Sequence, residues 1–513
     1  MDILGLVTIP GWLLTVLLIV LSLYLYSKYK LSFWSRLGVP YVKPTLLLGN
    51  VTRMGNGIGE FDLEMFYEYD KVIGTYILHK PSLLLLDPKL VRDVMIKNFS
   101  SMPNRTHPFK SKTDLHHAVS RLKGDHWRFM RNTLSPIFAS GKMRKMCPAL
   151  TQACQRLFNS IEHESRLGNA IEFKRMFGNF TMDAIASLGF GMQLDLYKED
   201  ENEFVTKAKE VFLAFGGLGV ILDSFMPPLY KLLVKLGFDM DGQSKHCLFF
   251  RQFVEQARTQ REKGDKDRAD ILQLLLDAHN DNEVNDTEKM NDYKSNKDEW
   301  KKRGLTNDEI NGNSIAFMIA GYDTTASALT FTAYCLATNP ECQDKLLEEI
   351  DSTVGQDQPD YDNTQKMEYL DCVIKEALRL YTPAQRTVRE TDVDLEIAGY
   401  NIPKNTEISI PIYALHRHPK YWKNPIKYDP DRFLAKNKSN LTPYTFLPFG
   451  LGPRSCIAMR LAYLEAKCAL VTILQKYKFV PCDKTEIPLK IDSRVLLKPK
   501  NGLFLEMEER KLS

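Results

Sequence analysis

The sequence lacks any pair of cysteines at the spacing of a zinc or dithiol site. Its 513 residues include nine cysteines, which are scattered singly along the chain. An odd number of isolated cysteines argues against a disulfide framework and indicates a body that faces a reducing compartment. The histidine pairs His116–His117 and His416–His418 each lack a third ligand at usable spacing for a metal. We interpret these histidines as hydrogen-bonding or surface residues.

The chain also lacks a strong charge of either sign, flexible linkers and internal repeats. A net charge of +4 is too small to indicate nucleic acid binding, and no basic stripe with interleaved aromatic residues is present. Length alone allows about three domains of ~150 residues, yet no Gly/Ser-rich or Pro-rich stretch separates such domains. With 44% hydrophobic residues, the chain can instead bury one large core.

Charged residues are absent between Ile3 and Ser27, where leucine, isoleucine, valine and tyrosine dominate. A helix needs about 20 apolar residues to cross a bilayer, so this stretch is long enough. Two lysines and an arginine follow it, and positive flanks remain on the cytosolic side. A cleaved signal peptide would begin with positive charge and end in small residues, and neither is present. We predict a single-pass membrane anchor at residues 1–27 and a cytosolic catalytic body at residues 28–513.

A loop rich in glycine and proline, FLPFGLGPRSCIAMR, precedes a segment with helical periodicity. Apolar residues after the loop recur at spacings of three or four: Ile457, Leu461, Leu464, Cys468, Val471 and Leu474. A helix is therefore predicted to begin at or just after Cys456. Free backbone N–H groups and the positive end of the helix dipole favour a thiolate at that point. A single thiolate suits the axial position of a haem iron, whose other four donors come from the porphyrin. The alternative is that Cys456 is a small buried apolar residue.

A capping box from Thr306 to Glu309 predicts the start of a long helix. No proline follows until Pro340, so the helix can run for about 33 residues, or ~50 Å. Its middle, FMIAGYDTTASALTF, is almost entirely small or apolar, as in a helix of the core. Asp323 and Thr324 lie there, and Thr324 is predicted to donate to the carbonyl of Ala320. A buried carboxylate needs a partner, so the alternative is a core helix with a satisfied acid.

Two further pairs have ordinary structural interpretations when each is taken alone. Trp127 and Arg131 lie four residues apart and share one helix face, which fits an exposed basic helix with an anchoring aromatic residue. Glu376 and Arg379 lie three residues apart in VIKEALRLY, and an exposed ion pair of this kind contributes little to stability.

The order and spacing of these segments resemble the cytochrome P450 family. The loop resembles its haem-binding signature, with Phe449, Gly452, Arg454 and Cys456 at signature positions and Ala458 where the family normally has glycine. The middle of the long helix is similar to the motif (A/G)Gx(D/E)TT for oxygen activation, and DHWRFMR is similar to the family's WxxxR feature. The Glu376–Arg379 pair resembles the ExxR pair, which Arg432 would complete. The resemblance covers the chain from about Lys28 to its end.

The resemblance implies a mainly α fold with a small β region, the cytochrome P450 fold, preceded by an N-terminal transmembrane helix. It implies haem b, iron protoporphyrin IX, as the cofactor, with Cys456 as axial ligand of the iron. Cofactor contacts are expected from Arg105, Trp127, Arg131, Ala320, Arg389, Phe449, Arg454 and Cys456. The residues expected to relay protons are Asp323 and Thr324. A buried structural cluster is expected from Glu376, Arg379 and Arg432.

The segment IPKNTEISIPIYALHRHPKYWKNP looks closest to animal microsomal members that oxidise steroids and drugs, of the family-3 type. The implied function is monooxygenation of a lipophilic substrate, a steroid, fatty acid or xenobiotic, at the endoplasmic reticulum membrane. No segment resembles a flavin or NADPH domain, so an NADPH-dependent cytochrome reductase is the expected electron donor, with cytochrome b5 as a second candidate partner. Two alternatives keep the haem: an isomerase that rearranges peroxides without a reductase, and a non-enzymatic haem sensor.

Two surface hypotheses complete the sequence analysis. A basic patch is expected to dock the reductase, and it consists of Lys123, Arg128, Lys142, Arg144 and Lys145. The segment from Phe204 to Leu236 is apolar and rich in glycine, with large side chains at Phe212, Phe215, Ile221, Phe225 and Met226. These side chains belong either to the core or to a loop that enters the bilayer surface. The resemblance implies the loop, as the roof of the substrate cavity.

Overall fold

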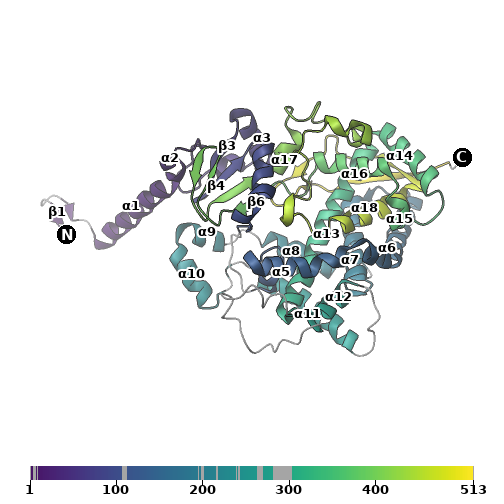
Figure 1. The fold of residues 1–513 in the computed structure, drawn as a ribbon, viewed down its shortest axis with the longest axis horizontal. Helices are drawn as coiled ribbons and strands as arrows, with labels where there is room; N and C mark the ends of the chain where they lie inside the picture. The colour runs from purple at the N-terminus through teal and green to yellow at the C-terminus, as the bar shows by residue number, and fades with distance from the viewer. Residues whose placement is uncertain are drawn as a thin grey trace.

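The computed structural model shows a mainly helical body and a smaller β-rich part, which lies beside the base of a long N-terminal helix (Figure 1). It describes residues 2–3, 7–8, 10–106, 113–194, 196–197, 202–214, 218–238, 240, 243–262, 270–280 and 303–511. This architecture, mostly helical with a small β region, confirms the fold class expected from the sequence.

The helices account for most of the body. Their bounds are α1 Gly11–Leu31, α2 Phe33–Arg36, α3 Ile58–Glu68, α4 Pro88–Arg92, α5 Gly124–Leu134, α6 Ser140–Arg166, α7 Phe173–Phe190, α8 Glu203–Leu213, α9 Leu218–Phe225, α10 Pro227–Lys235, α11 Ser244–Glu262, α12 Ile271–Asn280, α13 Asn307–Ala337, α14 Pro340–Thr353, α15 Tyr361–Thr364, α16 Glu368–Leu380, α17 Ile412–Arg417 and α18 Met459–Leu474.

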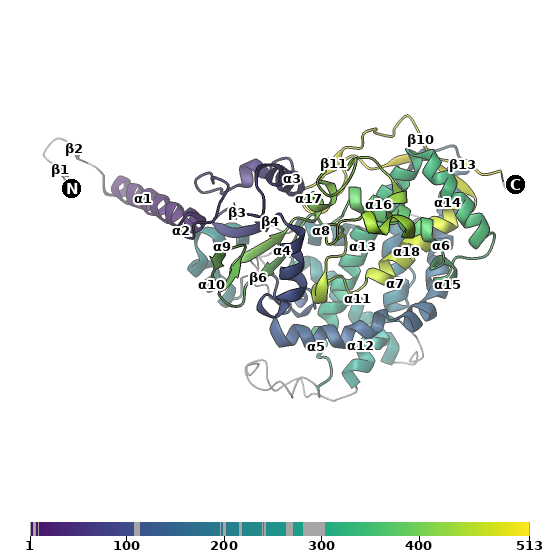
Figure 2. The ribbon, with the colours of Figure 1, turned by 45° about the horizontal axis from the view of Figure 1, so that its top comes forward.

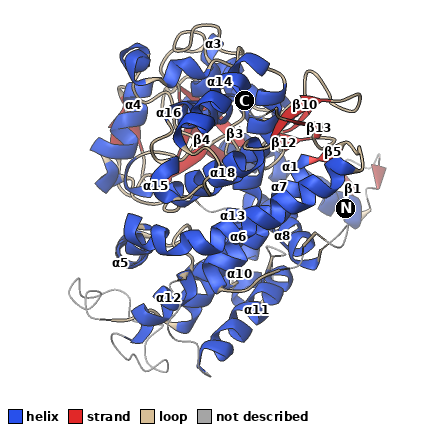
Figure 3. Ribbon diagram, turned by 90° about the vertical axis from the view of Figure 1, so that its right-hand side faces the viewer, coloured by secondary structure: helices blue, strands red, loops and turns tan. Residues whose placement is uncertain are grey.

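The strands are short and form small sheets, seen in red in Figure 3. Their bounds are β1 Asp2–Ile3, β2 Val7–Thr8, β3 Val72–Ile77, β4 Lys80–Leu85, β5 Ile171–Glu172, β6 Thr387–Glu390, β7 Leu395–Ile397, β8 Tyr400–Ile402, β9 Glu407–Ile410, β10 Tyr477–Pro481, β11 Ile491–Asp492, β12 Lys498–Pro499 and β13 Phe504–Glu509. One sheet has the order β3-β4-β9-β6, in which only β4 and β9 are parallel, and another has the order β10-β13-β5.

The long helix α13 runs through the middle of the body (Figure 1). Its capping box is present, because the Thr306 side chain accepts from the Glu309 N–H and the Glu309 side chain accepts from the Thr306 N–H. The helix is 31 residues long and packs against α7, α16 and α18. Most of its residues are buried, including Ile310, Leu329 and Phe331. The prediction of one long core helix is therefore confirmed.

The β-rich part has a separate apolar core between the base of α1 and the helical body. The β3–β4 hairpin pairs Val72 with Leu85, and the side chain of Leu85 is fully buried. Trp34 of α2 is buried against this hairpin and donates from Nε1 to the carbonyl of Thr75 (3.1 Å). A Cβ on Gly74 would lie 2.4 Å from the Trp34 ring, so glycine permits this contact. The chain that follows α1 is thereby fixed to the sheet.

The helix α1 projects from the body (Figure 2) and is long and apolar enough to cross a membrane. It begins at Gly11, after Pro10, whose fixed φ suits the residue preceding a helix. It ends at Leu31, so the boundary predicted at residue 27 lies inside the helix. Ser27 is buried: its hydroxyl accepts from the Leu47 N–H (3.2 Å) and lies 2.9 Å from Nε2 of His79. The last turn of α1 therefore packs on the folded body.

The segment expected either in the core or at the bilayer surface forms the helices α8, α9 and α10. Ile221 is 50% exposed and Met226 is 48% exposed, so the core interpretation is wrong for these two residues. Phe225 contacts the imidazole of His79, with ring centroids 4.5 Å apart. The side chains of Phe212 and Phe215 lie outside the described part of the structure.

Candidate active site

The cysteine loop is closed by its own backbone and by two glycines. The N–H of Cys456 donates to the carbonyl of Phe449 at 2.8 Å. Gly450 and Gly452 have φ values of 73° and 70°, in the left-handed region that favours glycine. A Cβ on Gly452 would lie 2.1 Å from the carbonyl oxygen of Met95. The helix α18 begins three residues after the cysteine, as the periodicity predicted.

Cys456 is an exposed residue that is nevertheless surrounded by protein atoms. These atoms desolvate the thiol, and this burial raises its pKa. The N–H of Ala458 and the guanidinium groups of Arg131 and Arg105 act in the opposite direction but more weakly. The backbone N–H expected to favour a thiolate therefore acts in that direction, but desolvation of the metal-free thiol outweighs it. A cation bound to the sulfur would shift the balance towards the thiolate.

Four guanidinium groups gather beside this cysteine, and no described carboxylate forms an ion pair with any of them. They belong to Arg105, Arg131, Arg389 and Arg454. Burial lowers the pKa of Arg389 to about 9 and that of Arg454 to about 8, and neighbouring arginines add to both shifts. Nε of Arg105 and both Nε and Nη2 of Arg389 are buried without a hydrogen-bond partner in the described structure. A cluster of this kind requires an anion with several acceptor oxygens.

The four arginines differ in how much of their hydrogen-bonding capacity the protein already uses. The guanidinium of Arg454 lies 4.0 Å above the Trp127 ring. It also donates to three backbone carbonyl groups, those of Pro103, Val119 and Leu122. Arg105 donates to the carbonyl of Arg454 (2.8 Å), and Arg131 donates to that of Ser455 (3.0 Å). Arg454 therefore mainly holds the segment around Trp127, whereas Arg389 has the most buried donors without a partner in the described structure.

The acid–alcohol pair lies in the middle of α13, as predicted. The hydroxyl of Thr324 donates to the carbonyl of Ala320 at 2.7 Å, which is the expected hydrogen bond. Ala320 is exposed although most of the helix is buried. The carboxylate of Asp323 accepts from Nζ of Lys174, at 2.5 Å.

Lys174 belongs to α7 and was not among the residues predicted from sequence. Its ammonium group also donates to the hydroxyl of Ser327 (3.0 Å), and its side chain is only 16% exposed. Burial lowers its pKa, and the charge of Asp323 opposes that shift. Its signal in the sequence is weak, because a lysine at the start of a helix is usually solvated. The partner that a buried Asp323 requires is therefore supplied by a different helix.

The Glu376–Arg379–Arg432 cluster, hereafter the Glu–Arg–Arg cluster, is fully assembled. Arg379 forms two hydrogen bonds to Glu376, at 2.7 and 2.8 Å, and both side chains are 0% exposed. Arg432 donates to the same carboxylate at 3.2 Å. Arg379 also donates to the carbonyl groups of His416 and Pro425. The cluster joins α16 to the segments on either side of residue 420, and it is buried rather than exposed.

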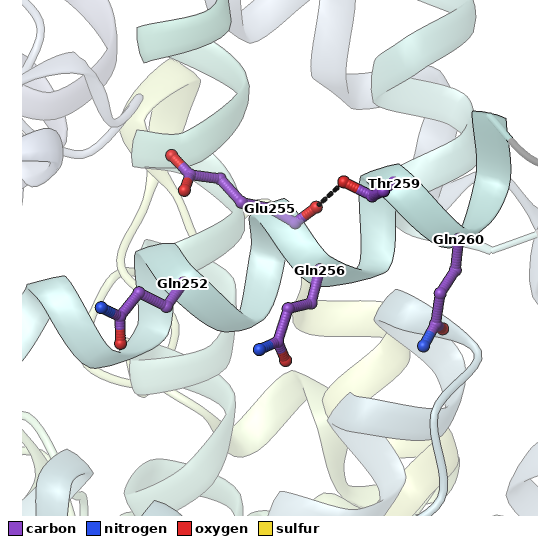
Figure 4. A pocket seen from close by; sticks show the side chains of 5 residues that line it. All are labelled: Gln252, Glu255, Gln256, Thr259 and Gln260. Atoms are coloured by element: carbon purple, nitrogen blue, oxygen red, sulfur yellow. Dashed lines mark hydrogen bonds between the residues drawn. The ribbon is translucent and has the colours of Figure 1, made fainter.

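Other parts of the described structure offer no comparable site. A polar hollow of about 700 Å³ lies on one face of α11 (Figure 4) and is lined by Gln252, Glu255, Gln256, Thr259 and Gln260. Its acid, Glu255, pairs with Arg251 at 2.9 Å. No three His, Cys, Asp or Glu side chains among the described residues come together in a way that could hold a metal ion. The arrangement around Cys456 is therefore the candidate active site.

Comparison with known proteins agrees with this arrangement. The sequence profile described as Cytochrome P450 matches residues 39–507, and the chain belongs to the cytochrome P450 family. It is 36% identical to cytochrome P450 3A2 of Rattus norvegicus over 516 residues, and 99% of each chain is covered. It is also 36% identical to cytochrome P450 3A5 of Homo sapiens over 517 residues, again with 99% of each chain covered. The protein is thus a haem-dependent monooxygenase of the family-3 type.

The residues around Cys456 fit the haem that this family uses. Haem carries two propionate carboxylates, and Arg105 and Arg389 have buried N–H groups without acceptors. Its iron requires an axial donor, and Cys456 is exposed. Ala320, the predicted contact on α13, has a small side chain and is also exposed. Phe449, the remaining predicted contact, is half-buried and packs against Tyr463, with ring centroids 5.2 Å apart.

Proposed function

We propose that Cys456 is the axial ligand of the haem iron and that Arg105, Arg131 and Arg389 hold the propionates. One observation carries the proposal: the neighbouring guanidinium groups of Arg105 and Arg389 have buried N–H donors without acceptors, and Arg105 lies near the exposed Cys456. When bound, the haem supplies activation of O2 and insertion of one oxygen atom into the substrate, with the thiolate donating electron density that favours O–O cleavage.

The ligand assignment is tested with carbon monoxide. We expect the reduced, purified enzyme to show the strongly red-shifted Soret band of a thiolate-bound haem, and Cys456→Ser to lose it. Cys482→Ser is the matched control, since Cys482 is partly buried at the end of β10 and remote in sequence from the loop. A spectrum typical of histidine-bound haem in the unmodified enzyme would contradict the assignment.

Proton delivery is proposed to involve Asp323 and Thr324. The Thr324 hydroxyl is partly exposed and held by the Ala320 carbonyl, so it can exchange its hydrogen bond for one to a bound molecule. Asp323 lies one residue earlier, and its contact with Lys174 orients the carboxylate towards α7. The pair therefore connects the apolar centre of α13 with the partly exposed Lys174 side chain. The substrate class that suits an apolar site is a lipophilic molecule, such as a steroid, fatty acid or xenobiotic.

Electrons are proposed to come from an NADPH-dependent cytochrome reductase, with cytochrome b5 as a second donor. Three of the basic residues expected to dock it already form ion pairs: Lys123 with Glu390, Arg128 with Asp125 and Arg144 with Asp362. Lys142 and Lys145 form no ion pair with any described residue. These two lysines on α6 are therefore the part of the patch with charge available to an acidic partner.

Charge reversal tests the docking patch. We expect Lys142→Glu and Lys145→Glu together to slow reduction by the reductase about tenfold at low salt and to reduce its salt dependence. Lys478→Glu is a control on a different surface, because Lys478 already pairs with Asp344. Equal reduction rates in the patch variant and the unmodified enzyme would rule out docking at α6.

The protein is proposed to lie on the cytosolic side of the endoplasmic reticulum membrane, with α1 as its anchor. Exposed apolar side chains on α9 and α10 support a second membrane contact: Ile221, Met226 and Leu232 are each about half exposed. In Figures 1 and 2 these helices lie beside the base of α1. Contact between His79 and both Ser27 and Phe225 links α1 to α9. Both elements are thus placed to meet the same membrane surface.

A further inference from the structure

His416 and His418 belong to the HRHP segment, and the proposed function uses neither of them. His416 is 0% exposed, and its Nε2 accepts the backbone N–H of Leu447 at 2.7 Å. A nitrogen that accepts a hydrogen bond carries no proton, so this is the neutral ring with its proton on Nδ1. Nδ1 forms no hydrogen bond among the described residues, but it faces the backbone of Leu378 and Arg379 at the end of α16. Helix carbonyls at that end lack intrahelical donors.

The backbone of His416 is held by the Glu–Arg–Arg cluster. Nη1 of Arg379 donates to the carbonyl of His416 at 2.8 Å, and Arg379 is itself fixed by Glu376. Phe446, the first residue of the loop, stacks on the imidazole with ring centroids 5.3 Å apart. Among the described residues, the bond from Leu447 to His416 is the one hydrogen bond between α16–α17 and the cysteine loop.

Two further hydrogen bonds lie within the loop between Leu447 and the backbone of Cys456. The carbonyl of Leu447 accepts from the N–H of Gly450 at 2.9 Å. The carbonyl of Phe449 accepts from the N–H of Cys456 at 2.8 Å. A displacement of Leu447 therefore moves the turn that carries Cys456.

We propose that His416 is a positioning residue for Cys456: as a hydrogen-bond acceptor it ties the start of the cysteine loop to the Glu–Arg–Arg cluster. This inference rests on the proposed function, in which Cys456 is the axial ligand. Removal of a group that orients a metal ligand commonly changes affinity for the metal by about 10–100-fold.

The environment of His416 favours the acceptor role. Burial, together with the charges of Arg379 and Arg417, lowers its pKa to about 3, so the lone pair on Nε2 is available under ordinary conditions. If His416 only filled space, a leucine of similar size would serve equally well. The distinction between an acceptor and a space-filling ring can therefore be measured.

The experiment compares four variants of the haem-loaded, full-length enzyme. His416→Gln places an acceptor oxygen near the position of Nε2, whereas the oxygen of His416→Asn reaches only the position of Nδ1, and His416→Leu has no acceptor. His418→Leu is the control: it is also buried, but its Nδ1 accepts from Lys420 and its ring packs on Phe66, away from the loop. The measurements are the fraction of reduced, carbon monoxide-bound haem in the thiolate form, the rate of haem transfer to apomyoglobin, and the thermal midpoint.

We expect His416→Leu and His416→Asn to lose at least half of the thiolate form and to release haem about tenfold faster, with His416→Gln restoring both. His418→Leu should lower the thermal midpoint without changing either haem measurement. If His416→Leu fails to fold, the Gln and Asn variants, which are equally polar, decide the question. Equal spectra and haem release in Gln and Asn, or effects in His416→Leu that match those in His418→Leu, overturn the proposal. A missing thiolate band in the unmodified enzyme would instead reject the ligand assignment.

Discussion

Asp323 is the residue whose environment is most informative, because its partner lies on another helix. The carboxylate and the ammonium group of Lys174 are 2.5 Å apart, and both side chains are less than one fifth exposed. A buried charge without a partner is unfavourable by several kcal/mol. Lys174 therefore allows an acid to exist in the centre of α13, where the oxygen-activation motif of the family places it.

Replacing Lys174 tests this coupling. Lys174→Met leaves Asp323 without its partner, and we expect a loss of about 1–3 kcal/mol in the free energy of unfolding together with lower turnover. Asp323→Asn should reduce the effect of Lys174→Met, and the double-mutant cycle in urea measures the difference. Lys478→Met removes an exposed pair with Asp344 and should change stability by less than about 1 kcal/mol. Strict additivity of the two active-site changes would show that the contact is not energetically coupled.

Gly452 combines a left-handed backbone with a close approach to Met95. Gly452→Ala introduces both backbone strain and a Cβ at 2.1 Å from a carbonyl oxygen, so we expect loss of bound haem as well as stability. Gly168→Ala is the matched control, since Gly168 has the same φ of +70° with nothing within 4 Å. This control should lower the free energy of unfolding only through the strain of an alanine in the left-handed conformation, by about 1–2 kcal/mol. Haem content and the urea midpoint measure both variants, and equal losses would show that the contact with Met95 is unimportant.

For single residues, the sequence identifies those whose side-chain type is needed for the proposed haem ligation and proton transfer. Cys456, Asp323 and Thr324 stand in short motifs, and the structure places them in the loop and helix expected. Lys174 and His416 are different, because each acts through a partner more than 30 residues away along the chain. Neither has a local pattern that separates it from a solvated lysine or an ordinary core histidine, so only the packing of helices reveals them.

Among the elements, α13 was predictable because its start and its middle carry strong local signals. The capping box specifies its start, and the apolar middle specifies a buried helix. The α8–α10 segment lacks such signals, and its apolar composition fits both a core helix and a surface helix. Exposure of Ile221 and Met226 could be decided only from the structure. The start of α1 at Gly11 was likewise missed, because the uncharged run continues through Pro10 without a change in hydropathy.

The N-terminus of α13 predicts a pH dependence of stability. Burial alone raises the pKa of Glu309, but hydrogen bonds from His126 and Arg303 and the charge of Arg303 outweigh it and lower the pKa to about 2. A carboxyl whose pKa falls from 4.5 to about 2 on folding stabilises the protein above pH 4.5 and loses that effect as the pH falls towards 2. The shift corresponds to about 3 kcal/mol at most.

Glu309→Gln isolates this contribution. We expect the substitution to be strongly destabilising at about pH 6 and less so at about pH 3, because the carboxyl of the unfolded chain is protonated there while the folded one is still mostly ionised. Urea unfolding at both pH values, with Glu341→Gln at an exposed position of α14 as the control, measures the difference. An equal destabilisation at both pH values would mean that Glu309 is not held as a low-pKa carboxylate.

In the whole molecule, the body contains the candidate active site, and one end exposes apolar side chains. Arg389 and Arg454 are buried in the body, whereas α1 and the pair α9–α10 lie together at the opposite end from α14–α16 (Figure 1). The contacts of His79 with Ser27 and Phe225 join the two apolar elements. A helix that served only as the proposed anchor would not need this junction. The arrangement instead predicts that the body itself binds lipid, in addition to the span.

Removal of residues 1–31 separates lipid binding by α1 from lipid binding by the body. We expect the shortened enzyme to retain measurable affinity for phospholipid vesicles, because the exposed side chains of α9 and α10 remain. Ile221→Ser and Leu232→Ser should each then weaken binding roughly tenfold, equivalent to about 1.5 kcal/mol of apolar burial. Ile426→Ser is the control, since Ile426 is 81% exposed but lies beside α16 at the other end. Vesicle sedimentation measures all four proteins, and complete loss of binding on removal of α1 would restrict membrane contact to the N-terminal helix.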